Sequence, residues 1–158
     1  MNIAIRPYRT GDFETIRPMI VDSFEGVTVE QNVEEKLGLV NGHDWRWRKG
    51  RHVDEDVAAC PEGVFVAETD DGTIVGCVTT RVDREAGKGR IPNLAVAPTA
   101  RGLGLGRRLI EHALDFFREK GLVYAVIETM AHNPVGNHLY PSCGFEEVAR
   151  QVHFARKL

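Results

Sequence analysis

The chain has 158 residues, of which 42% are hydrophobic and 27% are charged, and its formal net charge is −3. This composition predicts a single domain, residues 1–158, and argues against a dedicated nucleic-acid-binding protein, which would carry an excess of basic residues. No apolar run is long enough to cross a membrane, no signal-peptide core is visible, and the three cysteines form no C-x-x-C pair, so we expect a cytoplasmic protein with reduced thiols.

The first 60 residues are predicted to form a short strand and up to three helices. Residues 3–7 have the pattern of a strand. Thr10 is expected to cap the first helix and Thr28 the second, with Gln31 as the capping-box partner of Thr28. A further helix is expected over residues 44–59. The apolar positions of the first two helices recur every three or four residues: Phe13, Ile16, Ile20 and Phe24, then Val29, Val33, Leu37 and Val40.

After residue 61 the pattern changes from helices to strands. Residues 64–68 and 73–82 are rich in β-branched side chains, and Asp70-Asp71-Gly72 between them is a hairpin signal. Another strand is expected over residues 90–96. These three strands should pair as an antiparallel sheet.

The C-terminal part alternates between helices and strands. A helix is expected after Gly104, ending near residues 120–121, and a continuous apolar strand over 122–129. A short helix begins at residues 133–134, and a last long strand is expected over 145–157. The helix between the fourth and fifth strands implies that those strands run parallel. The sequence therefore predicts an α/β layered domain.

A glycine-rich stretch, residues 101–106, opens the helix that follows the fourth strand and reads RGLGLG. Backbone N–H groups at a helix N-terminus have no intrahelical partners and favour phosphate, and glycine lets an anion approach the backbone closely. Arg101, Arg107 and Arg108 would add positive charge. A Walker loop is excluded because Gly106 is followed by arginine, and the spacing does not match G-x-G-x-x-G. We predict a pyrophosphate-binding loop.

Two motifs resemble those of the GNAT superfamily, acyltransferases that use acetyl-coenzyme A. Arg101, Gly104 and Gly106 match its R-x-x-G-x-G signature. A second motif, IETMAHNPVGNHLYPSCGF, begins at residue 127 and contains the other matching positions: Glu128, Asn133, Leu139-Tyr140 and Gly144-Phe145. The resemblance covers nearly the whole chain, although the family usually ends in two strands and only one is expected here. It implies a mixed, mostly antiparallel sheet with splayed parallel strands four and five and helices on both faces.

The resemblance also implies which residues bind the coenzyme and which catalyse acyl transfer. Glu128 would be the general base and Tyr140 the general acid, and a backbone N–H of the fourth strand would polarise the acyl carbonyl. The expected coenzyme contacts are Leu94, Ala95, Val96, Arg101, Gly102, Leu103, Gly104, Leu105, Gly106, Arg107, Asn133 and Tyr140.

Each of these residues also has a purely structural interpretation. Glu128 could be a solvated or ion-paired carboxylate at a strand end, Tyr140 a core residue that anchors the last helix, and Asn133 a helix N-cap. The base could instead be another acidic residue or a histidine. The candidates are Glu68, Asp83, His132 and His138.

The predicted function is transfer of acetyl from acetyl-coenzyme A to a primary amine by direct attack in a ternary complex. The acceptor could be a small molecule or a protein amine, and residues 25–59 would form its side of the site. Acidic residues 54–56 weakly favour a cationic small acceptor, although such a run is usually a solvated helix face. The alternative is a non-catalytic acyl-coenzyme A sensor. We expect no metal, nucleic acid or membrane partner, and a possible homodimer through the edge of the last strand.

Overall fold

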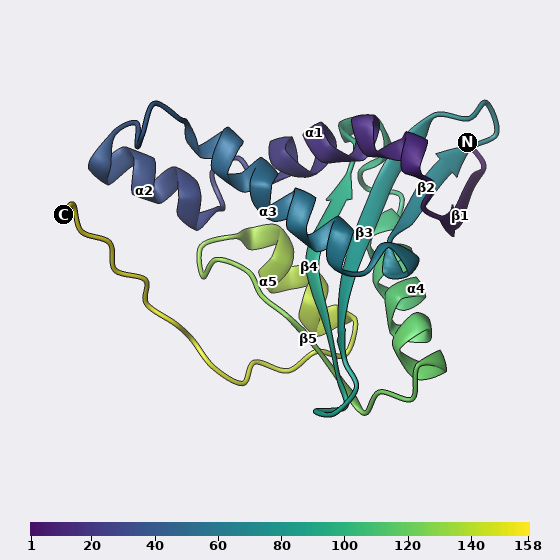
Figure 1. Cartoon of the computed structure of the whole chain (residues 1–158). Helices are drawn as coiled ribbons and strands as arrows, with labels where there is room; N and C mark the ends of the chain where they lie inside the picture. The colour runs from purple at the N-terminus through teal and green to yellow at the C-terminus, as the bar shows by residue number, and fades with distance from the viewer.

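The computed structural model describes residues 1–158 and has a five-stranded sheet at its centre, in the order β1-β2-β3-β4-β5 (Figure 1). The strands are β1 (Ile3–Pro7), β2 (Phe65–Thr69), β3 (Ile74–Asp83), β4 (Lys88–Val96) and β5 (Tyr124–Ile127). The first three pairings are antiparallel and the β4–β5 pairing is parallel. This is the mixed sheet that the sequence predicts.

Helices cover both faces of this sheet (Figure 1). Their bounds are α1 (Phe13–Ser23), α2 (Val29–Leu37), α3 (Trp45–Ala59), α4 (Leu105–Glu119) and α5 (Pro134–Ser142). Helices α1 and α3 pack against one face, and α4 packs against the other. No helix combines the length and the hydropathy that a membrane crossing requires.

Helix α4 supplies much of the core on its face of the sheet. Leu105, Leu109, Ile110 and Ala113 are buried as their spacing predicts, while Leu114 is only partly buried. Phe116 and Phe117 complete the buried face of the helix. A helix with one such apolar stripe gains most of its stability from packing that stripe against the sheet. The stripe therefore fixes where the N-terminus of α4 lies.

Strands β4 and β5 are paired along only part of β4. The paired residues of β4 run from Lys88 to Ile91, opposite β5, and β4 then continues to Val96 alongside β3 alone. The last residues of β4 thus have one unpaired edge. This is the predicted splay between strands four and five.

The N-terminal helices differ from the sequence prediction in their caps and in the burial of α2. Thr10 lies in a short 3-10 turn and does not cap α1. The capping contact at this point is made by Asp12, whose carboxylate accepts from the Arg9 N–H at 2.8 Å. Thr28 does cap α2, whereas Gln31 accepts from the Gly26 N–H at 2.6 Å and not from Thr28. No residue of α2 is buried, because this helix lies beyond the end of the sheet (Figure 1).

The predicted last strand over residues 145–157 is wrong. The chain after α5 has no regular secondary structure and extends away from the sheet (Figure 1). Its apolar side chains are exposed, Val148 at 90% and Phe154 at 93%. A β-strand forms only where a neighbouring strand pairs with its backbone N–H and carbonyl groups. Alternating apolar and polar residues in the sequence do not show whether such a neighbouring strand is present. The edge of the sheet is therefore β5.

Candidate functional site

The glycine stretch forms an open cradle of backbone donors at the start of α4. Gly104 is the N-cap residue with φ 73°, and Gly102 has φ 75°, a left-handed backbone that glycine adopts without strain. None of the six N–H groups from Gly102 to Arg107 donates to another backbone carbonyl. A Cβ built at Gly102 or Gly104 would meet no atom within 4 Å. The cradle can therefore accept an anion of the size of a phosphate.

The three arginines near this cradle have different partners. Arg101 donates from Nε to the Val96 carbonyl at 3.3 Å, next to the unpaired end of β4. Arg107 donates to the Ser142 carbonyl at 2.7 Å and to its Oγ at 2.8 Å, which ties α4 to the end of α5. Arg108 donates to the Ile3 carbonyl of β1 at 2.6 Å. Arg108 is thus engaged with β1 and does not add to the cradle as predicted.

The unpaired edge of β4 presents backbone groups of two residues. Ala97 donates its N–H to the Val75 carbonyl at 2.8 Å, in continuous register with the Cys77–Ala95 pair. Because backbone groups alternate along an antiparallel strand, Ala95 also faces β3, while Leu94 and Val96 direct theirs to the free edge. The side chain of Ala95 is buried in the core. Of the three predicted contacts, Leu94 has both its N–H and its carbonyl free, and Val96 has a free N–H, since its carbonyl accepts from Arg101.

Helix α5, which carries Tyr140, packs beside the start of α4. The two helices are close, since a Cβ on Gly106 would lie 3.2 Å from the side chain of Leu139, the residue before Tyr140. The Tyr140 ring packs edge-on to Phe145, with centroids 6.4 Å apart, as the structural interpretation requires. Burial raises the pKa of Tyr140, and the neighbouring charge of Cys143 acts in the same direction. A phenol in this environment stays protonated at neutral pH and can donate a proton.

Asn133 has the structural role that its position suggests. Its Oδ1 accepts from the Val135 N–H at 3.2 Å, so Asn133 caps α5. Its Nδ2 donates to Thr129 Oγ1 at 2.9 Å. Contact with a coenzyme stays a prediction for this residue.

Glu128 follows directly after β5 and is ion-paired across the sheet. Its Oε1 accepts from Arg90 Nε at 2.7 Å, and its side chain is 67% exposed. A carboxylate is the form that a general base needs. The pairing also matches the alternative interpretation of Glu128 as an ion-paired residue at a strand end.

The other candidate bases are not gathered at the splay. Glu68 on β2 accepts from Arg6 Nε at 2.7 Å, and Asp83 lies at the far end of β3. His132 is 2.9 Å from the Gly26 carbonyl, which joins the β5–α5 loop to the α1–α2 connection, and His138 lies exposed on α5.

A buried polar cluster under β4 was missed by the sequence analysis. It joins Lys49 and Asp56 on α3 to Asn93 on β4, and all three side chains are buried. Asp56 was interpreted as part of a solvated helix face, which is wrong, because only 8% of it is exposed. An asparagine among the apolar residues 91–96 at the end of β4 was the one signal in the sequence that could have indicated the cluster.

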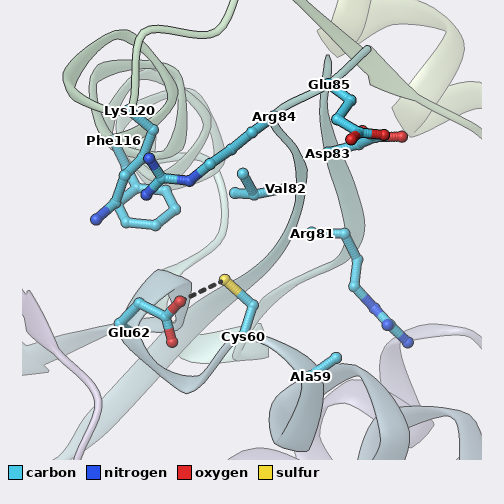
Figure 2. A pocket seen from close by; sticks show the side chains of 10 residues that line it. All are labelled: Ala59, Cys60, Glu62, Arg81, Val82, Asp83, Arg84, Glu85, Phe116 and Lys120. Atoms are coloured by element: carbon cyan, nitrogen blue, oxygen red, sulfur yellow. Dashed lines mark hydrogen bonds between the residues drawn. The ribbon is translucent and has the colours of Figure 1, made fainter. Parts of the chain in front are cut away.

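A cavity of about 620 Å³ lies where α4 and β3 end, away from the glycine cradle at the start of α4. Figure 2 shows the side chains that line it. Its lining residues are Ala59, Cys60, Glu62, Arg81, Val82, Asp83, Arg84, Glu85, Phe116 and Lys120. The Cys60 thiol donates to Glu62 Oε1 at 3.5 Å, and burial raises its pKa, so it is a poor nucleophile. Of the predicted site residues, only the alternative base Asp83 lines this cavity. The structure also gathers no group of three His, Cys, Asp or Glu side chains able to hold a metal.

Comparison with known proteins gives matches in sequence and in structure. Residues 28–145 match the model of the acetyltransferase (GNAT) family. An IAA acetyltransferase of Azospirillum brasilense is 36% identical over 95 residues, 60% of this chain and 62% of that protein. A mycothiol acetyltransferase of Cellulomonas flavigena is 36% identical over 103 residues, 60% of this chain and 29% of that protein. The alignments thus span less than two thirds of these relatives.

A solved structure shares the fold over most of its length. The PaiA N-acetyltransferase from Thermoplasma acidophilum, solved with coenzyme A, has a TM-score of 0.71 and 20% identity, with 92% of this chain and 91% of that chain covered.

Proposed function

We propose that this chain, which belongs to the acetyltransferase (GNAT) family, transfers an acetyl group from acetyl-coenzyme A to a primary amine. The observation that carries the proposal is the row of six unpaired N–H groups, Gly102 to Arg107, that adjoins the unpaired edge of β4. Coenzyme A has two parts that match these features. Its pyrophosphate is an anion that the row of N–H groups could hold, and its pantetheine arm is an extended chain that could lie along β4. We take residues 1–158 as one catalytic domain.

The residues present fit acetyl-coenzyme A as a substrate. The cradle would hold the pyrophosphate, and Arg101 would add charge beside it. The free backbone groups of Leu94 and Val96 would bond the amides of the pantetheine arm in the way an added strand does. The Leu94 N–H would then lie where the acyl carbonyl is polarised.

Acyl transfer needs a proton acceptor on the amine side and a proton donor on the sulfur side. Glu128, directly or through a water, would take the proton from the ammonium, whose ordinary pKa is about 10.4. The neutral amine then attacks the thioester carbon, the C–S bond breaks, and the nitrogen releases its second proton to solvent as the amide forms. Tyr140 would give its proton to the departing thiolate, and solvent would restore it. No covalent enzyme intermediate is needed.

The acceptor is proposed only as an amine, of a small molecule or of a protein. The relatives' names specify chemically different acceptors, so they do not select one for this chain. Residues 25–59 would form the acceptor wall, with α2 as its outermost part. We infer a cytoplasmic location from the three free cysteines, and a homodimer through the open edge of β5.

A thiol-detection assay tests the proposal. Purified protein is incubated with acetyl-coenzyme A and a panel of amines, amino acids and peptides, and released coenzyme A is measured. We expect release above the hydrolysis background with at least one acceptor. Tight acetyl-coenzyme A binding without release across the panel would favour the acyl-coenzyme A sensor. Absence of binding would contradict both.

A further inference from the structure

Asn93 is the centre of a buried polar cluster that joins β3, β4 and α3. Only 1% of this residue is exposed. Its Oδ1 accepts from Lys49 Nζ at 2.9 Å, and its Nδ2 donates to Asp56 Oδ2 at 2.8 Å and to Thr79 Oγ1 at 2.9 Å. Its side-chain amide therefore has its donor hydrogens and its oxygen engaged, and its conformation is fixed.

The cluster carries a positive charge that is not matched by a direct ion pair. Asp56 is already paired with Arg81, which donates to its Oδ1 at 2.9 and 3.1 Å. The ammonium of Lys49 has the neutral Asn93 oxygen as its acceptor and lies 3.7 Å from the centroid of the Phe24 ring. A cation–π contact and one hydrogen bond stabilise an ammonium less than a carboxylate partner does.

This charge destabilises the folded chain. Burial lowers the pKa of Lys49 to about 8, with Arg90 acting in the same direction and Asp56 and Glu30 opposing it. A methionine of similar length would fill the same space without that penalty. A buried charge that weakens the fold is typical of a residue retained for function.

The cluster adjoins the place where the acyl carbonyl is expected. Asn93 directly precedes Leu94, whose N–H faces the unpaired edge of β4. The backbone of Asn93 is held by β3 opposite Thr79, and its side chain is held by α3. The orientation of the Leu94 N–H therefore depends on both neighbours.

We propose that Lys49 and Asn93 are positioning residues for acyl transfer, which align the Leu94 N–H and place a positive charge near the oxygen that becomes negative in the tetrahedral intermediate. This inference rests on the proposed function. A fixed donor and a nearby charge in a water-excluded site lower the barrier because they are already oriented when the charge develops. Neither residue exchanges a proton with a substrate.

Two substitutions of Lys49 test the inference against a matched control. Lys49→Met removes the charge and the hydrogen bond, whereas Lys49→Gln removes the charge but can still donate to Asn93. The control is Arg17→Met, a partly buried cation on α1 that lies outside the proposed acceptor wall and whose Nε instead donates to Asp54 Oδ1 at 2.6 Å. For each protein we would measure kcat, the KM for acetyl-coenzyme A and the melting temperature.

We expect kcat to fall about 10- to 100-fold in both Lys49 variants, with KM within about twofold of wild type and no loss of melting temperature. Arg17→Met should keep kcat within about threefold. A Lys49→Met or Lys49→Gln kcat within threefold of wild type, or the same loss in the control, would overturn the inference. Wild-type protein that binds acetyl-coenzyme A but acetylates no amine would instead overturn the proposed function.

Discussion

The two faces of the sheet are built by different means. On the α4 face, apolar packing places a helix start whose backbone N–H groups stay unpaired, and no buried charge is involved. On the α1–α3 face, similar apolar packing surrounds a buried lysine, aspartate and asparagine beneath β4. The α4 face thus presents backbone N–H groups that have no partner within the chain. The α1–α3 face instead holds the charge of Lys49, which burial disfavours. Under the two proposals above, coenzyme binding relies on the α4 side, and orientation for acyl transfer relies on the α1–α3 side.

The largest expected effect concerns proton donation from α5. Tyr140→Phe removes the hydroxyl and keeps the ring against Phe145, so the packing should be retained. General acid catalysis contributes about 10²- to 10⁴-fold, and we expect kcat to fall in that range while coenzyme affinity stays unchanged. Steady-state kinetics with calorimetry measure both. A normal kcat would assign Tyr140 to structure alone.

Removal of the proposed base should produce a loss that depends on pH. Glu128→Gln keeps the shape and can still contact Arg90, but it cannot accept a proton. We expect about a 100-fold lower kcat/KM at pH 7 and partial recovery near pH 10, where about 30% of an alkyl amine is already deprotonated. A mutant profile that superimposes on wild type at every pH would show that Glu128 does not participate.

A substitution in the cradle should affect binding rather than chemistry. Gly104→Asp places a carboxylate where the pyrophosphate is expected, and acetyl-coenzyme A affinity should fall at least about tenfold, or about 1.4 kcal/mol. Gly72→Asp in the β2–β3 turn is the matched control, because both glycines have positive φ, 73° and 85°, and open space around them. Calorimetry on the two folded variants compares them. Equal affinities of Gly104→Asp and Gly72→Asp for acetyl-coenzyme A would show that the cradle does not bind the coenzyme.

The smallest expected effect is on the free energy of unfolding, through buried Lys49 on the α1–α3 face of the sheet. The pKa of Lys49 is about 8 in the fold and 10.5 in the unfolded chain, so between these values the unfolded chain binds more protons. Stability then rises with pH. Relative to Lys49→Met, the free energy of unfolding of the wild type should rise by about 1 kcal/mol from pH 7 to pH 9. Urea melts of both proteins at each pH measure this, and a constant difference would contradict a charged, buried Lys49.

The same comparison explains what the sequence could predict. The cradle and the packing stripe of α4 are local patterns, in which the positions of glycines and apolar residues determine the structure directly. The Lys49–Asn93 contact joins residues 44 positions apart, and nothing near either residue indicates the other. The prediction of a last strand over residues 145–157 was wrong for a related reason. A strand needs a neighbouring strand, and the alternating pattern of its own residues does not identify one. Local patterns thus revealed the binding side, and only the fold revealed the buried cluster.

The central claim is that coenzyme A binds at the start of α4 and along the unpaired edge of β4. Titration of ¹⁵N-labelled protein with coenzyme A, followed by amide chemical shifts, tests this residue by residue. The account predicts large shifts for Gly102, Gly104 and Leu94 and none for Val82 and Phe116, which line the cavity at the other end of α4 (Figure 2). Shifts confined to that cavity, with the cradle amides unchanged, would contradict it.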